Sequence, residues 1–168
     1  MLMTSAKASK KLKELNDQIQ QLQEVDRKSS VFLAAMGEDP ETVRPEYDFK
    51  KISEEISKLQ EKVRIIKHAL NVFNTTTKLT RYPMTIDEAL VFLPQLTTDK
   101  KRLEQMAVRL PKERKEEVYG RSNIIDYKYT NYDIVEAKTL LDETRKLLHE
   151  IQLDLNDINT SVEFEVNI

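Results

Sequence analysis

Two stretches of the chain carry apolar residues at alternating steps of three and four, the spacing of a helix that buries one narrow face. We call each such row of positions a seam. A seam this regular predicts a long helix that packs against other helices, as in a bundle or a coiled coil. The first seam is Phe49, Ile52, Ile56, Leu59, Val63, Ile66, Leu70 and Phe73, and the second includes Ile134, Leu141, Leu148, Ile151, Leu155 and Ile158.

The two seams end in similar residues at a fixed offset, since Leu70-Asn71-Val72-Phe73-Asn74-Thr75 returns as Leu155-Asn156-Asp157-Ile158-Asn159-Thr160. Asn accepts left-handed backbone at a helix end, and β-branched Thr favours extended backbone. The shared residues therefore predict a repeated helix stop at Asn71, Asn74, Thr75, Asn156, Asn159 and Thr160. We expect two parallel helices with Thr75 and Thr160 near the same pole. We also expect the strands that follow them to form one small sheet, within the chain or across a dimer.

The remaining patterns predict two further helices and three short strands. The helices cover about residues 5–35, 46–74, 86–110 and 132–159, and the strands about residues 76–82, 123–130 and 161–167. The third helix begins with a capping box at Thr85 and Glu88. Because the connections are short, we expect a mainly α fold. It would be an elongated up-down four-helix bundle or coiled coil with short β strands at the poles, in a single domain covering residues 1–168.

Composition narrows the class of protein. The 168 residues are 33% charged and contain only two Gly, which favours long helices over a loop-rich fold. No Cys is present, so disulfides and thiol chemistry are excluded and the cytoplasm is favoured. The N-terminus lacks a signal-peptide pattern, and no apolar stretch approaches membrane-spanning length. We therefore expect a cytoplasmic protein.

Candidate chemistry is sparse. His68 and His149 are the two histidines, and neither belongs to a metal-binding spacing, so we expect both on helix surfaces. Two Gly cannot build a phosphate-binding loop, and no Ser-His-Asp or paired-carboxylate arrangement stands out. We expect no enzymatic activity, no catalytic or metal-ligating residue and no cofactor.

Nucleic acid is a weaker candidate partner. Lysines gather near Lys7 and Lys100, and Tyr127 and Tyr129 could stack on single-stranded bases. However, acidic residues surround the lysines, and 27 basic side chains nearly balance 29 acidic ones for a net charge of −2. We expect no dedicated nucleic-acid partner, and a weak nucleic-acid-binding module is kept as an alternative.

Several motifs together resemble the septicolysin-like family of small bacterial proteins. They are Glu38-Asp39-Pro40-Glu41, Leu70-Asn71-x-x-Asn74 with Thr77-Lys78-Leu79, Thr85-Ile86-Asp87-Glu88-Ala89-Leu90, and the closing run from Ile158 to Phe164. Two positions depart from the family pattern: Arg81-Tyr82-Pro83 replaces an Asp-Gly turn, and Thr160 replaces a Trp. The resemblance implies a small intracellular helical protein, and it transfers no catalytic residues.

The leading hypothesis is an oligomerising helical-bundle protein with a scaffolding or protein-interaction role, as a homodimer or a higher homo-oligomer. Its motivation is the pair of apolar seams and the lack of a recognisable chemical site. The family name suggests a membrane-active, cytolysin-like protein as the alternative. A membrane role would require the helices to rearrange and expose their seams.

Overall fold

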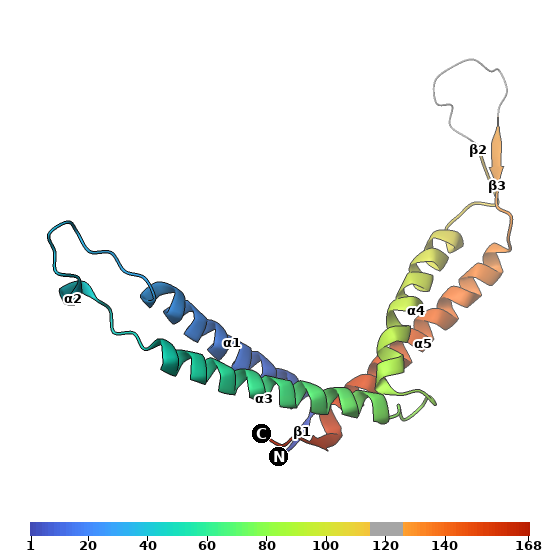
Figure 1. Cartoon of the computed structure of the whole chain (residues 1–168). Coiled ribbons are helices and arrows are strands. Elements are labelled where there is room, and N and C mark those ends of the chain that lie inside the picture. The colour runs from blue at the N-terminus through green and yellow to red at the C-terminus, as the bar shows by residue number, and fades with distance from the viewer. Residues whose placement is uncertain (115–125) are drawn as a thin grey trace. The chain divides into compact units, whose positions relative to one another are not determined.

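The computed structural model describes residues 1–114 and 126–168, and it confirms a mainly helical fold with a few short strands. The chain forms two compact units, one of residues 1–77 with 157–168 and the other of residues 78–156. Each unit contains a pair of long helices that lie side by side, which we call a helical hairpin (Figure 1). A single four-helix bundle is not confirmed.

The first unit contains β1 (Leu2–Thr4), α1 (Ser5–Ser29), the short α2 (Pro40–Val43), α3 (Phe49–Thr76) and β4 (Glu163–Glu165). Helices α1 and α3 pack along their apolar faces, because an isolated amphipathic helix is marginal in water. The core of this unit is a cluster of buried side chains from both helices and from the two chain ends. Its members are Met3, Ala8, Leu15, Ile66 and Val166.

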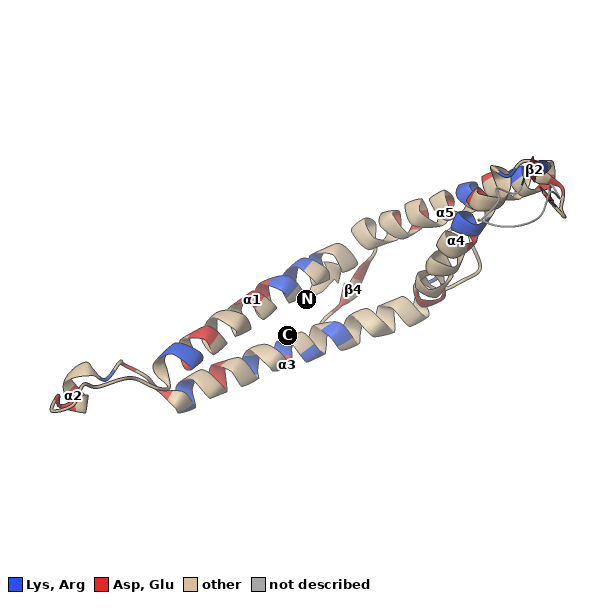
Figure 2. Ribbon diagram, turned by 90° about the horizontal axis from the view of Figure 1, so that it is seen from above, with Lys and Arg blue, Asp and Glu red and all other residues tan. Residues whose placement is uncertain are grey.

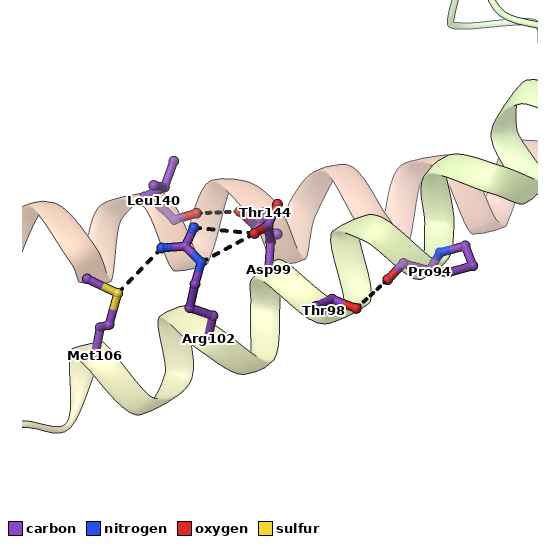
Figure 3. Close-up of polar contacts among 7 residues, drawn as sticks. All are labelled: Pro94, Thr98, Asp99, Arg102, Met106, Leu140 and Thr144. Carbon is purple, nitrogen blue, oxygen red and sulfur yellow. Dashed lines mark hydrogen bonds and ion pairs between the residues drawn. The ribbon is translucent and has the colours of Figure 1, made fainter.

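The second unit contains α4 (Ile86–Ala107), β2 (Lys112–Arg114), β3 (Tyr127–Tyr129) and most of α5 (Ile134–Ser161). Leu103 and Ala107 of α4 pack against Leu141 of α5. Helix α4 continues through Pro94, whose carbonyl accepts a hydrogen bond of 2.9 Å from the Thr98 hydroxyl (Figure 3). The antiparallel β2–β3 ribbon closes the hairpin at its far end.

Helices α3 and α5 are equivalent in length and in their caps. Both helices have 28 residues. Their first residues, 49 and 134, are 85 positions apart, and so are their last residues, 76 and 161. Asp48 accepts a hydrogen bond of 3.0 Å from the Lys51 amide at the start of α3. At the start of α5, Asp133 accepts one of 2.7 Å from the Val135 amide. A capping carboxylate satisfies amides that have no partner inside the helix.

The ends of these two helices match in the same way. The Thr76 hydroxyl donates to the Val72 carbonyl at 2.7 Å, and the Ser161 hydroxyl donates to the Asp157 carbonyl at 2.6 Å. The donors and the acceptors are again 85 positions apart. The offset therefore describes a duplicated folded element and not merely a similar string of residues.

The duplication extends to the preceding helices, α1 and α4, with an offset of 81 positions. Thr4 caps α1 by accepting from the Lys7 amide at 3.3 Å, and Thr85 caps α4 by accepting from the Glu88 amide at 3.2 Å. The expected capping box at Thr85 is confirmed. Ala8 and Ala89, which also correspond, are both fully buried. Each repeat thus consists of a Met-Thr segment, two long helices and a short extended segment.

The strand pairs follow the same correspondence. Strand β1 pairs antiparallel with β4, with Thr4 opposite Glu163. In the second unit a single bridge joins Thr85 to Lys78. Position 85 corresponds to position 4, and position 163 corresponds to position 78, so these two pairs are equivalent. The extended segment at the end of each repeat pairs with the segment that begins the other repeat.

Within the chain, the strands after α3 and α5 do not pair with each other, contrary to that expectation. Each instead pairs with a short segment that ends in a helix N-cap, at Thr4 or at Thr85. Those residues, Leu2–Thr4 and Met84-Thr85, look like simple cap segments because they are too short to show a period-two pattern. The last turns of α3 and α5, with Thr75 and Thr160, do belong to the same unit.

Two predicted helix boundaries shift around the first hairpin loop. Helix α1 ends at Ser29 rather than near residue 35. The apolar residues after Ser30 are mostly exposed, so burial does not stabilise further turns. Helix α3 starts at Phe49 rather than at residue 46, because Asp48 provides the cap after Pro45.

Two boundaries also shift in the second repeat. Helix α4 ends at Ala107 rather than at 110. The Met106 carbonyl accepts from the Arg109 amide at 3.3 Å in a tighter turn, and from the Tyr132 hydroxyl at 2.8 Å. Helix α5 covers Ile134–Ser161 instead of 132–159, because Asp133 forms its cap and the hydroxyl of Ser161 prolongs its last turn.

The predicted strands are longer than the observed ones. Thr76 is still helical, so the predicted strand 76–82 is reduced to the bridge at Lys78. Strand β4 occupies the centre of the predicted range 161–167. Strand β3 lies in the predicted range 123–130, of which residues 123–125 fall outside the described residues. The short strands β1 and β2 were not expected from the sequence.

Ile66 and Ile151 test the equivalence of α3 and α5, because they correspond by the offset and are both fully buried. Truncation to Ala should lower the free energy of unfolding by about 2–5 kcal/mol at either site, through lost apolar burial and a residual cavity. Val91→Ala, at an exposed position of α4, is the control and should change it by no more than about 0.5 kcal/mol. Urea unfolding would measure all three, and a near-neutral result at either isoleucine would contradict equivalent cores.

Candidate functional site

The α3 seam is buried only toward the end of the helix. Ile66 and Phe73 are buried, whereas Phe49 at the start of the helix is 66% exposed. The seam residues Ile52, Ile56, Leu59, Val63 and Leu70 are half-buried. A helix that packs against one neighbour leaves the flanks of its seam in contact with solvent.

The α5 seam is more deeply buried. Ile134 and Leu148 are half-buried, and the other four seam residues, Leu141, Ile151, Leu155 and Ile158, are buried. The residues of the predicted helix stop are half-buried (Asn74, Asn159) or exposed (Asn71, Thr75, Asn156, Thr160), and all six lie within the helices. The shared sequence therefore predicts the helix ends to within two residues, while hydroxyl-to-carbonyl bonds make the final turn.

The loop that closes the first hairpin exposes a group of large apolar side chains. Val31 is 76% exposed, Leu33 is 93% exposed and Met36 is fully exposed. Residues 30–48, which we call the acidic loop, also contain five acidic side chains and a single basic one. Figure 2 shows acidic residues gathered around α2 in this loop. Exposed apolar groups within a charged setting are typical of a surface that binds a partner.

Internal hydrogen bonds order the acidic loop. The Glu38 carboxylate accepts from the Ala35 amide at 2.9 Å, and Asp39 caps α2 by accepting from the Glu41 amide at 3.0 Å. Gly37 has a φ of 87°, a left-handed conformation that a side chain would strain. Met36 thus lies in a structured turn, which reduces the entropy lost when a partner binds.

The far end of the second hairpin has the opposite charge. Residues 108–114 and 126–130, which we call the basic end, contain four basic and two acidic side chains. The Lys112 ammonium lies 4.0 Å from the centre of the Tyr127 ring, a cation–π contact. Val108 and Leu110 are 78% and 61% exposed. A groove of about 430 Å³ at this end is lined by Arg109, Leu110, Glu113, Lys128, Tyr129 and Thr130.

A polar anchor joins the start of the second repeat to α5. The buried Asp154 carboxylate accepts a hydrogen bond of 2.8 Å from the Arg81 amide. One turn away, the Tyr82 hydroxyl donates to the Glu150 carboxylate at 2.6 Å. This hydrogen bond, followed by desolvation and the nearby negative charge, raises the pKa of Tyr82 above its ordinary value.

The histidines do not form a chemical site. His68 and His149 are both exposed. No group of three or more His, Cys, Asp or Glu side chains in the described part of the chain is arranged to hold a metal ion. Among the helices of residues 1–114 and 126–168, none combines the length and the apolar character that a membrane span requires.

The exposure of the acidic loop was not predicted from the sequence. The apolar run Val31–Met36 suggested a continued helix, yet it has no facing seam and ends in a glycine turn. The groove at the basic end had no local signal, because its lining comes from both sides of the hairpin connection.

Comparison with known proteins supports the fold alone. No family model matches the chain, and no curated protein matches it in sequence. A crystal structure of a functionally unknown conserved protein from Corynebacterium diphtheriae is similar, with a TM-score of 0.60 and 18% sequence identity. The similarity covers 98% of this chain and 100% of that one. The septicolysin-like resemblance therefore remains a sequence-based expectation.

The bond between Tyr82 and Glu150 can be tested by titration. Because it raises the pKa of the phenol, its contribution to stability is fully present below the unfolded-state pKa and is lost as the pH rises through the folded-state pKa. In Glu150→Gln the Tyr82 resonance, followed by NMR with ¹³C-labelled tyrosine, should titrate at a lower pH than in the wild type. An unchanged titration midpoint would show that the carboxylate does not hold the phenol.

Proposed function

We propose that this protein is a self-associating interaction protein, in which the acidic loop of one copy binds the basic end of another. The proposal rests on one observation: both hairpin ends expose apolar side chains, and the two ends have net charges of opposite sign. The acidic loop has a net charge of −4 and the basic end one of +2, from five acidic against one basic and four basic against two acidic side chains. Residues 115–125, between the two parts of the basic end, add two basic and two acidic side chains and leave this balance unchanged.

The two surfaces are complementary in charge, and each exposes apolar side chains. The acidic loop presents Met36 on an ordered turn and Leu33 just before it, and the basic end has a groove lined by Arg109 and Lys128. An apolar side chain could enter this groove while Glu38 and Asp39 approach the two cations. Opposite charge would steer the encounter, and apolar burial would supply most of the affinity.

Two different surfaces that bind each other form a heterologous interface, which makes rings if the rotation closes and open chains if it does not. Such an assembly would be a scaffold, in agreement with the interaction role expected from the sequence. The cytolysin-like alternative has no support at the acidic loop, which anionic lipids would repel, and would have to rely on Val108 and Leu110 at the basic end.

Variants of each surface test the proposal. Leu33→Glu in the acidic loop and Lys128→Glu at the basic end should each lower the mass measured by light scattering, because each places a carboxylate in the interface. Val91→Glu, at an exposed position of α4, is the matched control and should keep the wild-type mass. A monomeric wild-type protein at all concentrations would contradict the proposal.

Mixing the two variants separates a heterologous interface from a symmetric one. Each variant keeps one intact surface, so an equimolar mixture of Leu33→Glu and Lys128→Glu should form a dimer that neither forms alone. Analytical ultracentrifugation would detect it. Failure to form this dimer would contradict loop-to-end binding, and leakage of vesicles at low protein concentration would favour the membrane alternative.

A further inference from the structure

A second surface, separate from the hairpin ends, lies along the last turns of α3 beside β4. It is a groove of about 610 Å³ in the first unit. Its lining includes the aromatic rings of Phe73 and Phe164, which stack with their centres 4.7 Å apart and their planes at 23°. Ile65, Ala69 and Val72 extend this apolar surface. The volume lies in the usual range for small-molecule sites.

The second repeat contains a surface on α5 that corresponds to this groove, and there Tyr82 covers it. The offset of 85 positions takes Asn167, which lines the groove, to Tyr82 in the second unit. Tyr82 lies against α5, where its hydroxyl donates to Glu150. An aromatic ring therefore follows the extended segment in one repeat, whereas the corresponding residue of the other repeat is an amide with no ring.

The helix residues that face these segments also differ in polarity between the two repeats. Glu150 and Asp154, which accept hydrogen bonds from the segment around Tyr82, correspond to Ile65 and Ala69 in the groove. In the first unit the groove wall is therefore apolar, and no aromatic side chain stands at the position that corresponds to Tyr82. The chain itself indicates the size and the character of the group that fits, namely a single aromatic ring.

The groove also has a cationic side. Arg64 and His68 lie one turn apart on α3, line the groove and are exposed. Within the described residues, neither side chain has a hydrogen-bond or ion-pair partner. A guanidinium and an imidazole N–H both donate to carboxylate oxygens. Glu165 also lines the groove, which favours a ligand with one anionic end placed on the Arg64 side.

We propose that this groove binds a small aromatic carboxylate, with its ring over the Phe73–Phe164 pair and its carboxylate toward Arg64 and His68. The ring takes the place that Tyr82 occupies in the other repeat. The site does not depend on the hairpin ends, so it goes beyond the proposed self-association.

Titration of the full chain with 3-phenylpropanoate, followed by ¹H–¹⁵N NMR, tests the site. Saturable shifts should appear at amides of residues 64–76 and 164–167, with millimolar affinity as expected for a fragment of this size. The corresponding amides of residues 149–161 provide an internal control, because Tyr82 covers that place. Absence of saturable shifts, or equal shifts at both places, would overturn the proposal.

Two variants test the geometry. Asn167→Tyr should supply the missing ring and weaken binding by about tenfold or more, while Asn131→Tyr, the same change at an exposed position outside the groove, should have no effect. Arg64→Gln, at an exposed position where the fold tolerates change, should weaken 3-phenylpropanoate but not the neutral 3-phenylpropan-1-ol. Unchanged binding of the acid in both Asn167→Tyr and Arg64→Gln would overturn the proposal.

Discussion

A short antiparallel pairing at the helix junctions holds both repeats in register. In the first unit Met3 is opposite Phe164, and in the second the Leu79 amide donates to the Met84 carbonyl at 2.9 Å. A hairpin of two helices has little core of its own, so its ends need a further contact to prevent fraying. The pairing provides that contact and brings Phe164 onto α3, where it stacks on Phe73. The caps at Thr4 and Thr85, the core of the first unit and the groove all include residues of these segments.

Duplication explains why equivalent positions can have different chemistry. The helix caps and several buried residues are the same in kind in both repeats, as at Ile66 and Ile151 or Ala8 and Ala89, because the helix ends and cores impose the same demands twice. Outside these positions the repeats have diverged. The Tyr82 segment is held by carboxylates of α5, and the matching place on α3 is apolar. One repeat uses this surface for its own stability, which leaves the other repeat able to bind a ligand.

Much of the helical structure could be predicted from the sequence, because a seam and a cap are local signals. The capping box at Thr85 and the 85-residue correspondence of α3 and α5 are examples. The strand pairing could not be predicted, since a three-residue strand has no measurable period and Leu2–Thr4 gains its partner only when the chain ends meet. The end of α1 was missed for a related reason. The run after Ser30 is apolar enough for a helix, but no facing surface buries it. The basic end is likewise formed from segments that are separated along the chain.

The fold thus exposes an acidic loop, a basic end and an apolar groove beside β4 on a duplicated helical frame. The groove follows from the way in which the extended segment of each repeat pairs with the beginning of the other. Cross-strand NMR contacts test this claim most directly. Close contacts are expected between the backbone protons of Met3 and Phe164, and between those of Leu79 and Met84. Contacts between residues 78–80 and residues 163–165 instead would contradict it, because they would show that the two repeated strands pair with each other.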